Sequence, residues 1–314
     1  MKLYFGGSQI ISKGNGIELK IGDTKINLDP RRKADLSFVS HAHSDHVPSS
    51  IGGKVLLSSP THSLISKDIS APYDFGEDIQ IENLNLSILE SGHMLGSGQL
   101  LIENGMRVVY TGDLNLKGGL TTGKAAVPKC DVLIIEATYG HPRYNFPKRE
   151  EVVKEIKDWA DDCLKSDITP VLLGYSLGKA QELTKYLSKD FSVSVHRSIY
   201  DNNKKYEQLG VDLGEYEMFD GSCSGIAIIP PAARKGLNGE DLCFAFASGW
   251  ALHKGAGRRY STKAGFPLTD HSGFDDLIEY VEGADPQVVY TTHGFSKEFS
   301  EELGERDFYS EAIN

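Results

Sequence analysis

The stretch SHAHSDH, residues 40–46, follows directly on the apolar run 36–39 and places three histidines and one carboxylate within six residues. Histidine is the commonest metal ligand near neutral pH. Alternate residues of an extended segment project to the same side, so His41 and His43 are placed to bind one ion. Asp45 and His46, beyond the strand end, can turn toward a second ion. The alternative is a polar turn that happens to be rich in histidine; the pattern favours a metal centre.

A related pattern recurs along the chain, in which an apolar strand is followed by His, Asp or Glu. Strands are predicted near residues 84–89, 106–111, 131–135 and 287–292, and the polar residues that follow them are His93, Asp113, Glu136 and His293. His93 lies in a glycine-rich loop, where a histidine has little to pack against and functional residues are common. Side chains supplied from successive strand ends converge in space even when they are far apart in sequence.

The candidate metal ligands are His41, His43, Asp45, His46, His93, Asp113 and His293. A tetrahedral zinc ion takes four ligands, so seven suit two ions that share one carboxylate. Asp113 is the natural bridge. Two ions about 3.5 to 4 Å apart activate water and stabilise the oxygens of an in-line displacement. Imidazole ligands favour zinc over magnesium or calcium, so we expect two divalent ions, zinc first, with manganese or iron as alternatives.

The periodicity changes along the chain. Residues 17–21 and 24–28 alternate like antiparallel strands joined by a glycine turn. From about residue 148 apolar residues recur at helical spacing, and strands then alternate with helices up to residue 247, which is typical of a small parallel α/β unit. A chain of 314 residues has room for two domains or for one domain with an insertion.

Charge and composition limit the partners. The formal net charge of −11 argues against non-specific binding to polyanions. Two divalent ions would add four positive charges and bring it to −7. No apolar run approaches the ~18 residues that span a bilayer, so we expect a cytoplasmic protein with no membrane partner. The four cysteines form no C-x-x-C pair, which favours free thiols.

Five motifs together resemble a known family. The stretch 40–46, followed by His93 and Asp113, resembles the metallo-β-lactamase fold. Four later motifs resemble its nucleic-acid-processing branch, the β-CASP nucleases: LIIEATYG (133–140), SLGKAQEL (176–183), TDH (269–271) and THG (292–294). The resemblance runs from about residue 36 to 300.

The resemblance implies an αββα sandwich, residues 1–145 and 262–314, interrupted by an inserted parallel α/β domain, residues 146–261. It also implies the roles of the ligands. One ion is held by His41, His43 and His93, the other by Asp45, His46 and His293, and Asp113 bridges them. Asp45 and Asp113 are therefore expected to be catalytic as well as ligating.

His271 is the general acid that the resemblance implies, and Glu136 orients it. A physical argument supports this role independently. An alkoxide leaving group needs a proton as its bond breaks, and a histidine that titrates near neutrality can supply it. A nearby carboxylate such as Glu136 keeps that histidine charged. The alternative for His271 is an ordinary surface histidine at a helix N-terminus.

Substrate-binding residues are expected in two places. Ser176, Gly178 and Lys179 lie between a predicted strand and a helix, where backbone N–H groups and the helix dipole favour an anion. An ordinary strand-to-helix turn is the alternative. Arg258 and Arg259 lie in a basic, glycine-rich connection and are expected to line the path of the nucleic acid.

The predicted function is a two-metal nuclease, and an exonuclease on single-stranded DNA is favoured. The passage from residue 248 to 271 resembles the ligase-associated DNA exonucleases and the crosslink-repair nucleases. His293 is also found in RNA-processing members, so an RNA exo- or endonuclease is the alternative. More distant alternatives are a small-molecule hydrolase, such as a thioesterase or lactonase, and a non-catalytic binding subunit. Association with other DNA- or RNA-processing proteins stays open.

Overall fold

The computed structural model describes residues 2–5, 8–13, 15–65, 67–69, 72–221, 223–237, 239, 241–253 and 262–313. The chain divides into two compact units. Unit 1 comprises Met1–Gly118, Thr122–Asn145 and His271–Asn314, and unit 2 comprises Gly119–Thr121 and Phe146–Asp270. The domain limits expected from the sequence, at residues 146 and 261, stay a prediction.

The first sheet of unit 1 is built from the N-terminal strands in sequence order. They are β1 (Lys2–Phe5), β2 (Ser8–Lys13), β3 (Gly16–Ile21), β4 (Thr24–Leu28), β5 (Leu36–Phe38) and β6 (Lys54–Leu56). Strands β1 to β4 pair antiparallel, and β5 and β6 join them in parallel. The predicted antiparallel pair at residues 17–28 is thereby confirmed. Helix α1 (Ser59–Leu64) follows β6.

The second sheet of unit 1 has the order β19-β18-β11-β10-β9-β8-β7. Its strands are β7 (Ile79–Ile81), β8 (Leu84–Glu90), β9 (Gly98–Glu103), β10 (Arg107–Tyr110), β11 (Val132–Glu136), β18 (Val288–Thr292) and β19 (Ser310–Ala312). Strands β10, β11 and β18 run parallel, so their carboxyl ends lie at one edge of the sheet. Helices α6 (Phe274–Ala284) and α7 (Ser296–Gly304) complete the unit.

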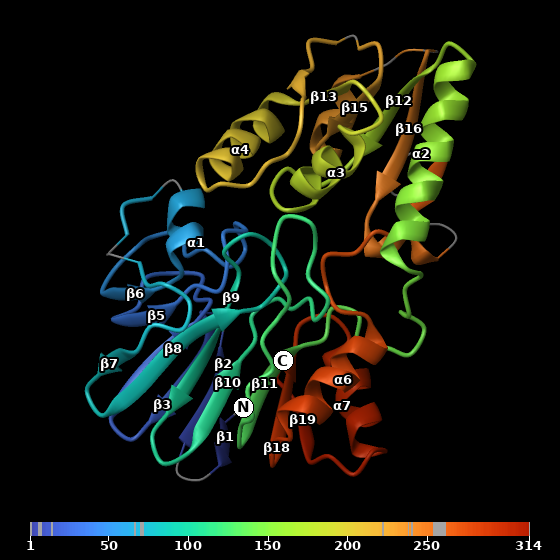
Figure 1. Ribbon diagram of the computed structural model, residues 1–314. Coiled ribbons are helices and arrows are strands. Elements are labelled where there is room, and N and C mark those ends of the chain that lie inside the picture. The colour runs from blue at the N-terminus through green and yellow to red at the C-terminus, as the bar shows by residue number, and fades with distance from the viewer. Residues whose placement is uncertain are drawn as a thin grey trace. The chain divides into compact units, whose positions relative to one another are not determined.

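The two sheets of unit 1 pack face to face (Figure 1). Leu28 and Phe38 of the first sheet and Tyr110 and Ile134 of the second belong to one buried cluster. Side chains alternate across a strand, so Val109, between Val108 and Tyr110, faces the other way and packs with residues of α6 and α7. The predicted αββα sandwich is confirmed.

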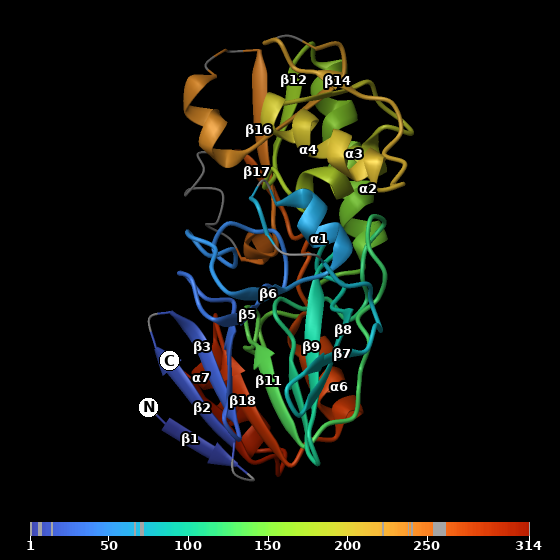
Figure 2. The same ribbon diagram turned by 90° about the vertical axis from the view of Figure 1, so that its left-hand side faces the viewer.

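Unit 2 contains a parallel sheet of order β14-β13-β15-β12-β16-β17. The strands are β12 (Thr169–Leu173), β13 (Val193–Val195), β14 (Glu217–Met218), β15 (Ile226–Ile229), β16 (Leu242–Ala247) and β17 (Ala264–Phe266). Helices α2 (Arg149–Lys165), α3 (Lys179–Leu187) and α4 (Arg197–Gln208) cover one face, as Figure 2 shows. Short helices η1 (Pro231–Gly236) and η2 (Gly249–Leu252) follow β15 and β16. The predicted parallel α/β arrangement is confirmed.

The apolar side chains of α2 explain its helical register. Val152, Ile156 and Ala160 recur at intervals of four and are buried against the sheet of unit 2. Within the described residues, no helix has the length and apolar content needed to cross a bilayer. The four cysteines are free thiols; Cys130 and Cys163 are buried, and the other two are half-buried.

Candidate metal centre

The histidine-rich stretch lies in a turn that follows β5, not in the extended conformation expected from the sequence. Strand β5 ends at Phe38, and the backbone N–H of His46 donates to the carbonyl of His43 over 3.0 Å. Residues 41 and 42 form a bend, so the segment that carries His41 and His43 is not extended as expected, whereas the turn expected at Asp45 and His46 is present. Even so, His41 Nε2 lies 3.0 Å from His43 Nδ1.

Imidazole nitrogens of three histidines, two from the stretch 40–46 and one from a later loop, surround the carboxylate of Asp113. Its Oδ2 lies 3.5 Å from His41 Nε2, 3.6 Å from His46 Nε2 and 3.7 Å from His93 Nε2. His43 Nδ1 is 3.3 Å from His93 Nε2. One ligand atom from each of His41, His43, His93 and Asp113 lies within 4.8 Å of the others. Four residues separated by up to 72 positions therefore share one small volume.

Glycine at position 112 lets β10 approach the turn. Gly112 has φ = +55°, and a Cβ there would lie 2.4 Å from the Cβ of Ser40. Both the backbone conformation and the space therefore require glycine. The next residue is Asp113, whose carbonyl accepts a hydrogen bond from Ser91 Oγ over 2.8 Å.

Burial and neighbouring charges shift the pKa values of three residues of the cluster. Burial and the neighbouring His46 hold the pKa of His41 well below its ordinary value, so its imidazole is neutral. Burial raises the pKa of Asp113, but His46, His41 and the other histidines outweigh it and hold the pKa well below its usual range. Burial lowers the pKa of His46, yet Asp113 and Asp29 raise it to about 10. The carboxylates of Asp113 and Asp29 therefore favour positive charge at His46.

The donor set fits a divalent metal ion. Imidazole nitrogens and an ionised carboxylate directed toward one small volume would all interact favourably with a cation placed among them. Nitrogen and carboxylate oxygen donors in this combination are those that zinc and similar ions prefer. His41, His43, His93 and Asp113 are therefore the residues best placed to hold one ion.

The second half of the centre is more open. Asp45 has an 82% exposed side chain, and its Oδ2 lies 3.9 Å from His46 Nε2. The exposed ring of His293 lies 5.6 Å from that of His46, centroid to centroid. His293 also has φ = +60°, a conformation that costs a non-glycine residue about 1 kcal/mol or more. Such strain is concentrated at functional sites. His46 is therefore packed close to Asp113, whereas Asp45 and His293 are exposed to solvent.

His271 lies beside this cluster and pairs with a buried carboxylate. Its Nδ1 is 2.8 Å from Glu136 Oε1, and its Nε2 is 3.9 Å from Asp113 Oδ2. Glu136 is held in turn by the backbone N–H groups of Leu114, at 2.6 Å, and Thr138, at 3.2 Å. The pair fixes the ring so that Nε2 faces the cluster.

Asp29 is a buried member of the centre that the sequence interpretation missed. Its carboxylate accepts hydrogen bonds from Ser40 N at 2.7 Å, Ser40 Oγ at 2.6 Å and Tyr110 OH at 2.8 Å, and it lies 2.8 Å from His46 Nδ1. Ser40 Oγ also lies 2.9 Å from His41 Nδ1. Asp29 therefore orients the ring of His46 directly and that of His41 through Ser40. A signal was available, because Asp29 is itself a carboxylate at the end of an apolar strand.

Replacing Asp29 with asparagine should weaken metal binding while the fold persists. The amide keeps the size of the side chain but loses the charge that aligns His46 Nδ1 and keeps its Nε2 toward Asp113. Carboxylates that accept a hydrogen bond from a metal-ligating histidine typically contribute about 10- to 100-fold in metal affinity. Competition with a chromophoric chelator measures the change. The exposed turn variant Asp23→Asn serves as control, and equal affinities of the two variants would refute the role.

The predicted substrate-binding residues of unit 2 are largely engaged within it. Lys179 is buried, its Nζ lies 3.3 Å from Asp270 Oδ1, and burial lowers the pKa of its ammonium. The N–H of Gly178 donates to Gln181 Oε1 over 2.7 Å, and the carbonyl of Ser176 accepts from Gln181 Nε2. A role of this segment in phosphate binding stays a prediction. Arg258 and Arg259 lie outside the described residues.

Comparisons with known proteins give relatives among nucleic-acid enzymes. No family model matches the sequence. The chain is 36% identical over 302 residues to a probable DNA ligase of Opitutus terrae, which covers 91% of this chain and 29% of that protein. It is 27% identical to an RNase J-like protein of Methanocaldococcus jannaschii, over 48% of this chain and 43% of that protein. It is 24% identical to the DNA cross-link repair protein SNM1 of Arabidopsis thaliana, over 81% and 60%.

The chain thus spans less than two thirds of the length of each of these three relatives. Among solved structures, it is similar to a protein of unknown function from Enterococcus faecalis V583, with a TM-score of 0.66 and 13% identity. That match covers 96% of this chain and 95% of the other. At this identity the likeness concerns the fold alone.

Proposed function

The chain belongs to the β-CASP branch of the metallo-β-lactamase-fold nucleases, and from this premise we propose that it hydrolyses phosphodiester bonds of nucleic acid. One observation carries the proposal. The nitrogens of His41, His46 and His93 converge on the ionised Asp113, and His271, paired with Glu136, faces the same carboxylate. Metal-dependent cleavage of a phosphodiester uses a cation site to activate water and a proton donor for the leaving oxygen, and unit 1 has candidates for both.

We propose two divalent ions, with zinc as the first candidate. His41, His43 and His93 would hold one ion, Asp45, His46 and His293 the other, and Asp113 would contact both. Ions held in this way lower the pKa of water and neutralise charge that develops on phosphoryl oxygens. The exposed Asp45 and His293 would adjust most on binding, since the rest of the set is buried or packed.

The chain's own acid–base residues are His271 and Glu136. The carboxylate of Glu136 accepts a hydrogen bond from Nδ1–H of His271, which leaves Nε2 to carry the transferable proton. This proton would pass from Nε2 to the leaving oxygen as the P–O bond breaks. Backbone N–H groups of Leu114 and Thr138 donate to the carboxylate of Glu136 and hold it in place.

The proposed substrate is single-stranded DNA, cleaved from an end. Two of the relatives are named for DNA ligation and DNA cross-link repair, and one is named as RNase J-like. RNA is therefore the alternative substrate.

The deciding assay compares single-stranded DNA and RNA of one sequence, each labelled at the 5′ end, with protein loaded with zinc or manganese. Exonucleolytic cutting from the labelled end releases labelled mononucleotide at once, whereas internal cutting gives a ladder of intermediate lengths. We expect mononucleotide from DNA at a higher rate than from RNA. Treatment with a chelator should stop the reaction. Turnover of thioesters or lactones without cleavage of either strand would refute the nuclease proposal.

A further inference from the structure

A cavity in unit 1 lies next to the more exposed half of the candidate metal centre. Its volume is about 950 Å³, and its lining includes Asp45, His46 and His293. Two basic residues to which no function has been assigned above, Arg31 and Lys67, line the same cavity. Arg31 begins the basic tripeptide 31–33, and Lys67 lies 36 positions further along the chain.

A short segment directly after His46 holds both basic residues. The N–H and the hydroxyl of Ser49 donate to the carbonyl of Arg31 over 2.9 and 3.1 Å. The ammonium of Lys67 donates to the carbonyl of Pro48. The segment that carries the ligand His46 therefore also positions two cations, which we name the basic rim: Arg31 and Lys67.

Both side chains of the basic rim have N–H donors that make no hydrogen bond within the described residues. Within the described part of the chain, the exposed guanidinium of Arg31 has no ion-pair or hydrogen-bond partner. Lys67 uses one of its three N–H donors on Pro48. Of the carboxylates that line the cavity, Asp29 is engaged by Ser40, His46 and Tyr110, and Asp45 is a proposed metal ligand. The rim can therefore accept an anion.

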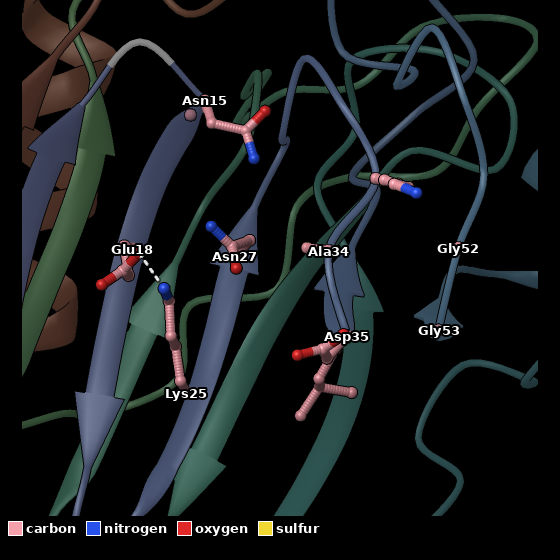
Figure 3. Close-up of a pocket in the computed structure, with 11 residues that line it drawn as sticks. Asn15, Glu18, Lys25, Asn27, Ala34, Asp35, Gly52 and Gly53 are labelled. Carbon is pink, nitrogen blue, oxygen red and sulfur yellow. Dashed lines mark ion pairs between the residues drawn. The ribbon is translucent and has the colours of Figure 1, made fainter.

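A neighbouring cavity, shown in Figure 3, is also lined by charged side chains and serves as a comparison. It measures about 500 Å³ and contains two lysines and two carboxylates, Lys25, Lys33, Glu18 and Asp35. Lys25 and Glu18 form an ion pair of 2.5 Å between β3 and β4. Positive and negative charges balance there, so this cavity has no preference for an anion. The cavity beside His46 differs because its two basic side chains are not paired with carboxylates.

We propose that Arg31 and Lys67 bind a phosphate of the nucleic-acid strand next to the phosphodiester that is cleaved. This inference rests on the proposed nuclease function and adds a binding subsite to it. A guanidinium presents two parallel N–H donors to phosphate oxygens, and an ammonium adds a point charge. Because the whole chain carries a net charge of −11, two cations without a carboxylate partner would favour the approach of a polyanion at this cavity.

The first test measures binding rather than turnover. Metal-loaded protein is titrated with a phosphorothioate single strand, which is hydrolysed slowly, at several salt concentrations. Arg31→Ala and Lys67→Ala should each weaken binding by about 10-fold or more. Each should also lower the slope of log K against log salt by about 0.7, the value for one lost phosphate contact on a single strand. Arg32→Ala is the matched control, since Arg32 is adjacent and exposed but does not line the cavity. Equal affinities and slopes of Arg31→Ala and Arg32→Ala would overturn the proposal.

The second test identifies the phosphate. Single linkages on either side of the scissile one are replaced by uncharged methylphosphonates. At one of these positions the parent should lose affinity, and Arg31→Ala should lose no more, because the contact is already absent. Additive losses at every position would contradict the subsite.

A small substrate separates this inference from the proposed function. Bis(p-nitrophenyl) phosphate has no neighbouring phosphate, so Arg31→Ala should lose much less activity on this ester than on a strand. If the parent cleaves neither this ester nor a strand, the nuclease proposal fails. If the parent cleaves both and Arg31→Ala also binds and cleaves strands like the parent, only the basic rim is refuted.

Discussion

Asp113→Ala is expected to abolish cleavage and to lose bound metal at the same time. The carboxylate is the one anionic group on which His41, His46 and His93 converge, so its removal leaves nitrogen donors without the charge that balances a cation. The metal contribution to phosphoryl transfer is worth several kcal/mol, so we expect a fall of about 10³-fold or more. Metal content per chain and the rate of strand cleavage measure the effect.

Two variants control this result. Asp158→Ala removes an exposed carboxylate of α2 and should leave both metal content and rate unchanged. Asp113→Asn keeps the shape and one oxygen donor and should bind metal more weakly than the parent. If Asp113→Ala retained two ions per chain and a rate near that of the parent, Asp113 would not be the shared ligand.

His271→Ala should lower the rate while the metal content stays at the parental level. A positioned general acid contributes about 10²- to 10⁴-fold, and that is the loss we expect on a natural strand, whose leaving group is an alkoxide. A p-nitrophenolate leaving group needs no proton, so hydrolysis of bis(p-nitrophenyl) phosphate should fall much less. The alkaline loss of activity that follows deprotonation of an acid should also disappear from the pH profile of the variant.

Glu136→Gln tests whether the acid acts through its carboxylate partner. The amide keeps the size of the side chain but removes the charge 2.8 Å from His271 Nδ1, so the strand should again be affected more than the activated ester. His271 Nε2 lies 3.9 Å from Asp113 Oδ2, close enough that a ligand role needs to be tested. Loss of metal in His271→Ala would assign His271 to the ligands and refute its role as acid.

The sequence predicted most of the fold because periodicity and chain order carry that information. Strands at residues 17–28, the strand ends that carry Asp113 and Glu136, and the helix beginning near residue 148 are local patterns, and each has its counterpart in the structure. The αββα arrangement with an inserted parallel α/β unit came from the resemblance, and it is confirmed. The backbone at residues 41 and 42 was predicted less well, because the same polar residues are common both in extended segments at strand ends and in bends.

The candidate site was predictable as a set of residues because each lies next to a strand end or in a dense local motif. His41, His43 and His46 are neighbours in sequence, and His93 and Asp113 follow β8 and β10. Their roles as ligands stay predictions. The difference between a closely packed half and an open half could not be predicted, because side-chain exposure depends on what the rest of the chain places around Asp45 and His293.

The sequence by itself determined which chemical groups are available, since motif spacing and strand periodicity are encoded locally. Only the tertiary structure decided their partners. It placed Asp29 under His46, and it brought Arg31 and Lys67 to one rim through Pro48 and Ser49. It also buried Lys179 against Asp270, 91 positions away. The physical reason is that hydrogen bonds and ion pairs depend on distances of about 3 Å, and a distance between residues far apart in the chain is set by packing, not by their spacing in sequence.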